Sequence, residues 1–257
     1  MALALITGGS GGIGLAMAEQ LAAQKTDLIL TARSGSTLER IARDLSAKNG
    51  VQVIPVPLDL AKLDAPGELV DEIGRRGLEP GILINNAGYG SYGKFVESPV
   101  QEQLDMIRLN VNALVELTAL LLPGMVARRS GRIMNVASTA AFQPGPLMAV
   151  YYATKAFVLH FSEAIDNELE GTGVTVTALC PGPTTSGFQE RAAMTESRLV
   201  KGPMMDAATV ARIGLEAMFA GKPVVIPGML NRMVAFSTRL APRSVTTRIA
   251  RQVQEKA

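Results

Sequence analysis

TGGSGGIG, residues 7–14, is the stretch that decides the fold of this 257-residue chain. It follows a short apolar run at residues 2–6 and leads directly into a helical pattern. Glycine permits a tight chain reversal and close approach of an anion to the backbone, and a helix N-terminus offers unpaired N–H groups and a positive dipole. The stretch predicts a strand-to-helix turn that binds phosphate, with Gly8, Gly12 and Gly14 in these roles. An ordinary glycine-rich connection has the same signature in isolation, so the surrounding pattern has to decide.

Short apolar runs and longer amphipathic segments alternate along the rest of the chain. Helical patterns at residues 13–24 and 37–48 flank a predicted strand at 27–32. Further strands are predicted at residues 51–56, 82–84, 132–136, 174–179 and 224–226. Buried strands joined by helical crossovers form a parallel sheet with helices on both faces. The sequence therefore predicts an α/β fold with a doubly wound, Rossmann-type sheet, whose ligands bind beyond the carboxyl ends of the strands.

No linker rich in proline, glycine or serine divides the chain, so we expect a single domain. Residues 1–228 are expected to form its Rossmann-type part, and residues 229–257 a basic helical extension of the same domain. The charged side chains of this extension are Arg232, Arg239, Arg243, Arg248, Arg251 and Lys256 against the single acid Glu255. We expect the extension to pack on this chain or on another subunit, and contact with a membrane surface or an acidic partner is the less favoured alternative.

The composition excludes several classes of function. The formal net charge is +2, and no basic cluster is interleaved with aromatic residues, so no nucleic-acid partner is expected. One cysteine, Cys180, and one histidine, His160, cannot build a disulfide framework or a zinc site, which favours a cytoplasmic protein without a metal. The first residues lack the basic segment of a secretory signal. The longest apolar stretch, residues 111–126, falls short of the ~20 residues that a membrane span requires.

The end of the second predicted strand indicates which dinucleotide the turn would hold. In dinucleotide-binding folds an acidic residue at this place binds the adenosine ribose of NAD. Here the strand ends in TARS, residues 31–34, with no carboxylate at Ala32 and with Arg33 beside it. A guanidinium binds phosphate through a planar fork of donors, so the 2′-phosphate of NADP(H) is favoured over NAD(H). A solvated Arg33 at the strand end is the alternative.

Tyr151 and Lys155 are four residues apart at the start of a helical stretch and therefore lie on one face of it. A phenol has a pKa near ~10, and a neighbouring ammonium stabilises the phenolate and lowers that pKa. By itself this spacing also occurs by chance on surface helices. Ser138 supports a functional interpretation, because it follows the predicted strand at 132–136, at the edge of the sheet where ligands bind.

In their order along the chain these motifs resemble those of the classical short-chain dehydrogenase/reductase family. The resemblance extends over about residues 2–226 and rests on TGGSGGIG at 7–14, NNAG at 85–88, Ser138, YxxxK at 151–155 and PG at 181–182. It implies a catalytic tetrad of Asn110, Ser138, Tyr151 and Lys155. It also implies an oxidoreductase that transfers a hydride between NADP(H) and a carbonyl or alcohol.

The same resemblance implies which residues bind the cofactor. Asp59 would contact the adenine, Asn86 the adenosine side and Lys155 the nicotinamide ribose. The full expected set is Gly8, Ser10, Gly12, Ile13, Gly14, Arg33, Ser34, Asp59, Leu60, Asn86, Ala87, Gly88, Tyr151, Lys155, Pro181, Gly182, Thr184 and Ser186. At residue 186 the family often has threonine, and serine keeps the hydroxyl.

For reduction, the expected roles are polarisation of the carbonyl by Ser138 and proton donation by Tyr151. The resemblance implies that Asn110 anchors a water molecule that connects Lys155 to solvent. The loops expected around the substrate are residues 89–95, 139–150 and 184–205, and their apolar side chains are Phe142, Leu147, Met148, Phe188, Met194, Met204 and Met205. They predict a hydrophobic ketone or aldehyde as the small-molecule substrate. A catalytically silent NADP(H)-binding sensor is the alternative, because a fold and a cofactor turn do not prove turnover.

The helical stretches at residues 110–126 and 151–169 are apolar on more than one side. In the family that the chain resembles, the equivalent helices form subunit interfaces, so we expect a homodimer or homotetramer. Deeper burial within one chain is the alternative, because periodicity does not show whose surface covers an apolar face.

Overall fold

A seven-stranded parallel sheet forms the centre of the computed structural model, which describes residues 3–192, 194, 202 and 204–255. Its strand order is β3-β2-β1-β4-β5-β6-β9. The strands are β1 (Leu3–Thr7), β2 (Asp27–Ala32), β3 (Val53–Pro57), β4 (Ile82–Asn85), β5 (Gly131–Val136), β6 (Val174–Leu179) and β9 (Val224–Val225). All seven were predicted, with boundaries shifted by one or two residues. A separate pair, β7 (Thr184–Thr185) and β8 (Met205–Asp206), was not predicted, because two-residue strands leave no periodic pattern.

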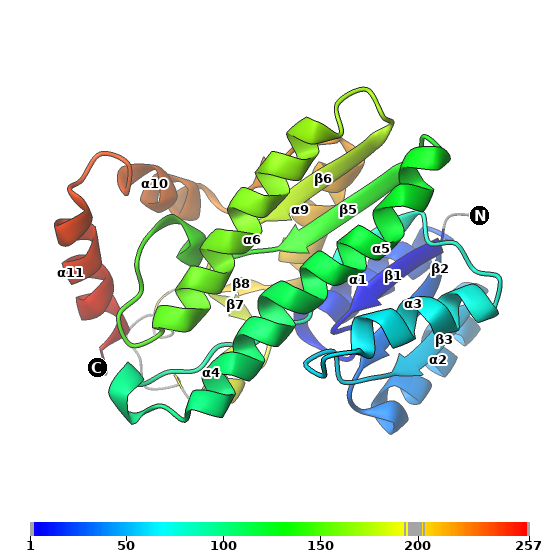
Figure 1. Cartoon of the computed structure of the whole chain (residues 1–257), viewed down its shortest axis with the longest axis horizontal. Helices are drawn as coiled ribbons and strands as arrows, with labels where there is room; N and C mark the ends of the chain where they lie inside the picture. Colours follow the sequence, from blue (N-terminus) through cyan, green and yellow to red (C-terminus); the bar gives the residue numbers. More distant parts are fainter. Residues whose placement is uncertain (1–2, 193, 195–201, 203, 256–257) are drawn as a thin grey trace.

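Helices cover both faces of this sheet, which confirms the predicted doubly wound α/β fold (Figure 1). One face carries α1 (Gly12–Ala23), α2 (Gly35–Asn49) and α9 (Ala207–Phe219). The other face carries α3 (Ala65–Arg75), α5 (Ala113–Ala127) and α6 (Ala149–Glu168). The remaining elements are η1 (Phe95–Glu97), α4 (Val100–Ile107), the π-turn η2 (Arg108–Asn112), η3 (Thr139–Phe142), α7 (Phe188–Arg191), α10 (Met229–Ser237) and α11 (Arg243–Gln254).

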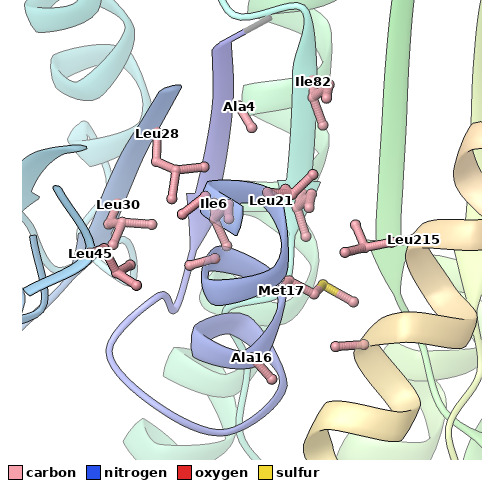
Figure 2. Packing of buried hydrophobic residues seen from close by; sticks show 14 of the residues in the cluster. Ala4, Ile6, Ala16, Met17, Leu21, Leu28, Leu30, Leu45, Ile82 and Leu215 are labelled. Carbon is pink, nitrogen blue, oxygen red and sulfur yellow. The ribbon is translucent and has the colours of Figure 1, made fainter. Parts of the chain in front are cut away.

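Alternate side chains of β1 contribute to two separate cores. Ala4 and Ile6 pack toward α1, where Met17 and Leu21 meet Leu215 of α9 (Figure 2). Leu5, between them in the sequence, packs on the opposite face with residues of α3 and α5. Successive strand residues point to opposite sides of a sheet, so a continuous apolar run is what a strand covered on both faces requires. Burying each such large side chain stabilises the fold by roughly 1.5–3 kcal/mol.

The strand order reverses between β1 and β4, and this places the crevice of the fold. From β1 the chain runs outward through β2 and β3, then returns to β4 on the other side of β1. At that point the Thr7 hydroxyl accepts hydrogen bonds from the backbone N–H groups of Asn86 (3.0 Å) and Ala87 (2.9 Å). Ligands of such sheets bind where the strand order reverses. The glycine-rich turn and the NNAG segment therefore meet at the expected binding edge.

The two edge strands of the sheet, β3 and β9, present different features at their open edges. The Leu58 N–H donates to the Ala32 carbonyl, so even-numbered residues of β3 face β2. Pro55 and Pro57 therefore occupy the positions that face the open edge. At the opposite edge, β9 contains only Val224 and Val225.

One helix within the described ranges, Val100–Ala127, is long and apolar enough to cross a membrane by length and composition. The apolar stretch at residues 111–126 was expected to be too short for a membrane span, whereas the helix that contains it is long enough by length and composition. The helix is longer because the π-turn η2 joins α4 to α5 without a break and because α5 continues through Pro123. A third of its most apolar window is buried, 33%, and α5 packs on α3 and β5.

Candidate active site

The glycine-rich turn has the backbone that its sequence predicts. Gly8 and Gly12 have positive φ angles of 67° and 55°, which residues with a side chain rarely adopt. The turn is held to β2 by a hydrogen bond from Gly8 N–H to the Thr31 carbonyl (2.8 Å). At the start of α1 no side chain caps the helix and the first turn contains no acidic residue. Unpaired N–H groups with a positive dipole therefore face the crevice, as a phosphate site requires.

Gly14 and Asn86 support the turn from behind. A Cβ atom at Gly14 would collide with the Gly8 carbonyl and the Asn86 side chain. The Asn86 amide donates to the carbonyls of Thr7 (2.9 Å) and Gly8 (3.3 Å). Gly14 does not line the cavity, and the close approach around it shows that it allows tight packing of the helix on the turn. Its predicted contact with a cofactor phosphate stays a prediction.

Arg33, Ser34, Asp59 and Leu60 line one end of the cavity, beyond β2 and β3. The Arg33 side chain is exposed at this end and forms no ion pair with any residue that the structure describes. Asp59 accepts a hydrogen bond from the Ala61 N–H (3.2 Å) through its carboxylate. A free guanidinium beside uncharged Ala32 leaves this end of the cavity attractive to an additional phosphate.

Ser138, Tyr151 and Lys155 line the same cavity at the other end of the sheet edge. Ser138 directly follows β5 and begins η3, where its hydroxyl accepts from the Ala140 N–H (3.1 Å) and reaches the Pro181 carbonyl (3.4 Å). Tyr151 and Lys155 occupy successive turns at the start of α6 and are both buried. Helix geometry thus brings the two heads to one place, as their spacing predicts.

Lys155 is held rigidly between α6 and the end of β5. Its ammonium donates to the Val136 carbonyl (2.7 Å) and lies 5.8 Å from the centre of the Tyr151 ring. Burial lowers the pKa of Lys155 to about 8, because desolvation disfavours the charged form. At neutral pH this side chain is therefore mostly protonated, with its proton easier to lose than that of a surface lysine.

The pKa of Tyr151 differs from the sequence-based expectation. We expected Lys155 to lower this pKa, whereas burial raises it to about 12 and a hydrogen bond with Ser138 opposes the rise only in part. The physical reason is that the ammonium points at the Val136 carbonyl, so desolvation of the phenol outweighs its attraction. The phenol is thus fully protonated at neutral pH, which suits it to donate a proton rather than to accept one.

Asn110 lies in the π-turn η2, and the protein itself occupies its side chain. Its amide donates to the Tyr89 carbonyl (2.9 Å) and to the Thr154 hydroxyl (3.1 Å), and its oxygen accepts from the Tyr89 N–H (3.1 Å). Thr154 lies between the two predicted catalytic residues of α6. The side chain does not line the cavity. Asn110 therefore ties the loop after β4 to α6, and the water that the family resemblance implies at this residue stays a prediction.

The loop after β6 contributes four residues of the predicted cofactor-binding set. Pro181, Gly182, Thr184 and Ser186 all line the cavity. A Cβ atom at Gly12 would meet Ser186 at 3.0 Å, which shows how closely this loop approaches the glycine-rich turn. The Thr184 hydroxyl donates to the Gly182 carbonyl (2.9 Å) and keeps the loop compact.

These groups surround one cavity of about 1110 Å³. Every predicted site residue lines it except Asn110 and Gly14. Of the apolar residues predicted for the pocket, Met148, Phe188 and Met194 line the cavity. Phe142, Leu147, Met204 and Met205 do not line it. Residues 193, 195–201 and 203 of the predicted substrate segment lie outside the described residues.

Part of the cavity wall is formed by the C-terminal extension, which was not predicted to line the site. Leu230 and Val234 of α10 line the cavity together with Ile249, Val253 and Gln254 of α11. Residues 230 and 234 are four apart, as are residues 249 and 253, so each pair shares one face of its helix. This spacing was the signal in the sequence that could have indicated two helix faces directed at the same ligand. Tyr152, which packs edge-to-face with Tyr151, was also missed.

The residues present fit a dinucleotide at this site. The positive-φ glycines form the tight turn at the start of α1, and a Cβ atom would crowd Asn86 and Ala87 at Gly8 or Ser186 at Gly12. The cavity is large enough for an extended cofactor and a substrate together, given that drug-sized ligands occupy roughly 300–1,000 Å³. No three His, Cys, Asp or Glu side chains gather to hold a metal in the part of the chain that the structure describes.

Comparison with known proteins identifies the family to which this chain belongs. The sequence pattern of the short chain dehydrogenase family matches residues 2–197. Over 221 residues the chain is 37% identical to a very-long-chain 3-oxoacyl-CoA reductase of Phaeosphaeria nodorum, covering 82% of this chain and 63% of that protein. The chain belongs to the short-chain dehydrogenase family, and it spans less than two thirds of the length of this curated relative.

Two solved structures have the same fold over nearly the whole chain. A short-chain dehydrogenase from Sphingobium yanoikuyae in complex with NADPH superposes with a TM-score of 0.84 at 32% identity, covering 93% of this chain and 94% of that one. The bulky-bulky ketone specific alcohol dehydrogenase from Comamonas testosteroni gives a TM-score of 0.79 at 29% identity, covering 93% of each chain. These likenesses confirm the family and the Rossmann-type fold predicted from the motifs.

Proposed function

We propose that this chain reduces a hydrophobic ketone or aldehyde with NADPH, and catalyses the reverse oxidation of the alcohol. The observation that carries the proposal is that Ser138, Tyr151 and Lys155 line the same cavity as the glycine-rich turn. Support comes from the relative named a 3-oxoacyl-CoA reductase and from the neighbour named a ketone-specific alcohol dehydrogenase.

NADP(H) is the proposed cofactor, and the bound reduced nicotinamide supplies the hydride. The N-terminus of α1 would hold the pyrophosphate, and Arg33 would pair with the 2′-phosphate through its guanidinium. Asp59 and Leu60 would contact the adenine, and Lys155 the nicotinamide ribose. The NADPH in the Sphingobium neighbour supports this preference.

The side chains at the other end of the cavity have separate roles in the reduction. The Ser138 hydroxyl donates a hydrogen bond to the carbonyl oxygen of the substrate and polarises it. The Tyr151 phenol, protonated at neutral pH, donates its proton to the oxygen as negative charge develops there. The Lys155 ammonium supports the resulting phenolate through its positive charge. Asn110 acts as a positioning residue through Tyr89 and Thr154.

The cavity wall favours an apolar substrate. Met148 precedes α6, Phe188 begins α7 and Met194 follows it, whereas Leu230 and Ile249 come from the C-terminal helices. The Phe188 ring lies 5.2 Å from the Tyr151 ring, so an apolar group would stand directly beside the proton donor. Bulky ketones and long-chain 3-oxoacyl thioesters both match this wall.

The test is NADPH oxidation over a panel of bulky ketones, aldehydes and 3-oxoacyl thioesters. Tyr151→Phe is expected to lower turnover at least about 10³-fold while NADPH still binds, because the change removes only the proton donor. Tyr152→Phe is the matched control, since its ring lines the same cavity beside Tyr151. A Tyr151→Phe enzyme that keeps its turnover would refute the assignment. Tight NADPH binding without turnover of any substrate would favour the silent sensor.

We also propose that the chain forms a homodimer or homotetramer through its apolar helices. Leu104 and Ile107 of α4, Leu120 of α5 and Phe157 of α6 are exposed on one monomer. The stacked rings of Phe157 and Phe161 extend this surface along α6. Light scattering of wild type and Phe157→Glu tests it, with a fall in mass of the variant as the expected result.

A further inference from the structure

The C-terminal helices expose an unusual density of large apolar side chains. Among the residues that the structure describes, Met229 and Leu240 are more than two thirds exposed, at 69% and 76%. The full exposed set in this region is Met229, Leu230, Met233, Val234, Phe236, Leu240, Val245, Ile249 and Val253. We call these nine residues the C-terminal apolar surface. α10 and α11 lie together at one end of the molecule (Figure 1).

Arginines accompany this surface without compensating acids. Arg232, Arg239, Arg243 and Arg248 are exposed, and none forms an ion pair with a described residue. Arg251 differs, because it pairs with Glu255 at 2.9 Å. The surface therefore combines apolar side chains with an uncompensated charge of about +4.

The same surface continues into the cavity. Leu230, Val234, Ile249 and Val253 are exposed and also line the cavity of about 1110 Å³. A second hollow of about 430 Å³ lies on α10, where Met233 and Phe236 sit between Arg232 and Arg239. An apolar molecule held at this surface would have an apolar route toward the cavity.

We propose that the C-terminal apolar surface docks this enzyme on an anionic lipid membrane. A second copy of the chain is a poor occupant, because a twofold interface would set the arginines of one patch against the same patch of its partner. An anionic bilayer complements both features, since it takes the apolar side chains at the headgroup boundary and attracts each arginine. The docked orientation presents the cavity mouth to the lipid. Delivery of an apolar substrate from the bilayer rests on the proposed function, whereas docking itself does not.

The test is sedimentation of the full-length protein with phosphatidylcholine vesicles, with and without phosphatidylglycerol. Wild type is expected to pellet with the anionic vesicles and to be released by high salt. Reversing four charges together, Arg232→Glu, Arg239→Glu, Arg243→Glu and Arg248→Glu, is expected to weaken binding at least about tenfold, since each arginine near an anionic surface is worth about fivefold.

The matched control reverses four exposed charges elsewhere, as Arg40→Glu, Arg43→Glu, Lys48→Glu and Arg75→Glu. It changes the net charge equally and is expected to keep most of the vesicle binding.

The double variant Met233→Ser and Phe236→Ser tests the apolar part of the surface independently, and vesicle binding should fall again. Equal loss in the patch and control variants, or no pelleting of wild type, would overturn the proposal. The proposal would also be overturned if reversing the four arginines lowered the molecular mass measured by light scattering but left vesicle binding unchanged. Sedimentation needs no turnover, so its failure leaves the proposed reaction standing.

A separate observation concerns Gln254, near the end of α11. Its side chain is 1% exposed and lines the cavity, yet neither its amide nitrogen nor its amide oxygen has a hydrogen-bond partner among the described residues. Its backbone carbonyl accepts from the Tyr92 hydroxyl (2.7 Å), which fixes the residue beside the cluster containing Tyr151 and Met148. A buried amide without a partner is costly, so a group in the cavity is the natural partner.

We infer that Gln254 binds a second polar group of the substrate, at a distance from the reacting carbonyl. This inference rests on the proposed function and narrows it to hydrophobic carbonyl compounds that also carry a hydroxyl or an amide. An amide accepts one hydrogen bond and donates another, so either group can pair with it.

The test compares pairs of ketones that differ only in a distal hydroxyl or amide. Gln254→Leu is expected to lower kcat/KM about tenfold for the ketones with that group and to leave the plain ketones unchanged or faster. Gln252→Leu, exposed on the same helix, is the matched control. An equal effect of Gln254→Leu on both members of each pair would overturn the inference. Absence of turnover by wild type would instead count against the proposed function.

Discussion

At the scale of single residues, Lys155 sets how the reaction responds to pH. Burial raises the pKa of Tyr151 to about 12, so this phenol keeps its proton throughout the physiological range, while the pKa of Lys155 is lowered to about 8. The value of kcat/KM reports ionisations of the free enzyme. For reduction it should be constant below pH 8 and fall as pH rises further, because neutral Lys155 no longer supports the phenolate. A profile measured from pH 6 to 10 checks this, and a flat profile would contradict it.

Arg33 is the residue on which cofactor preference should depend. Arg33→Ala is expected to weaken NADPH binding by about 1.5–3 kcal/mol and NADH binding far less, because the lost charge-assisted contact serves only the 2′-phosphate. Titration calorimetry with both cofactors measures the difference. Arg43→Ala on the exposed side of α2 is the control and should change neither. Equal weakening of both cofactors would exclude a 2′-phosphate site at Arg33.

Residues of the site could be predicted where the local pattern fixes their position. Ser138 was identified because it follows a strand, since parallel strands bring their carboxyl ends to one edge. Tyr151 and Lys155 were identified by their four-residue spacing, which places them on one face of a helix. Asn110 came only from the family resemblance, and its hydrogen bonds to Tyr89 and Thr154 follow from a π-turn that leaves no pattern in the sequence. The pKa of Tyr151 was misjudged because spacing shows that two groups are near, and does not show how much water is removed from each.

At the scale of secondary-structure elements, a chain of buried amides joins the strands that carry the site. The Asn85 amide of β4 donates to the Asn135 oxygen of β5 (2.9 Å), and the Asn135 amide donates to the Ser162 hydroxyl of α6 (2.9 Å). Each link crosses between elements whose ends hold site residues. In this low-dielectric interior the chain fixes the relative position of β4, β5 and α6.

Breaking this chain should destabilise the protein more than a polar substitution elsewhere. Asn135→Leu removes the shared partner of Asn85 and Ser162, and the free energy of unfolding should fall by about 1–3 kcal/mol. Denaturant unfolding measures the change. Asn167→Leu, exposed on the same helix as Ser162, should stay within about 0.5 kcal/mol of wild type. If Asn135→Leu were as stable as the control variant, the amide chain would have no structural role.

At the scale of the whole molecule, the cofactor should hold the two ends of the cavity together. NADPH would contact residues from β1 to the loop after β6, and a ligand that binds only the folded state stabilises it by mass action. At 100 times its dissociation constant, NADPH should raise the free energy of unfolding by about 2.7 kcal/mol. Thermal unfolding with and without NADPH measures the shift. An unchanged midpoint in saturating NADPH would contradict cofactor binding at this cavity.

The C-terminal wall of the cavity is the feature that sequence reasoning could not place. Tyr92 and Gln254 are 162 residues apart, and their hydrogen bond depends on the path of the chain after β9. Helical spacing gave α10 and α11 their amphipathic character, whereas the surface that each helix faces is a property of the complete fold. The sheet was predictable because local burial patterns mark its strands and because the connections between parallel strands have a fixed handedness.

The prolines of β3 bear on how copies of this chain can assemble. An exposed strand edge recruits further strands, and this growth leads to extended sheets and fibrils. Pro55 and Pro57 offer no N–H donors along one border, and β9 offers a ladder of only two residues along the other. Neither border can template a continuing sheet. Copies of this chain should therefore not grow by adding strand to strand, even in a crowded, concentrated solution, and any assembly should form through other surfaces.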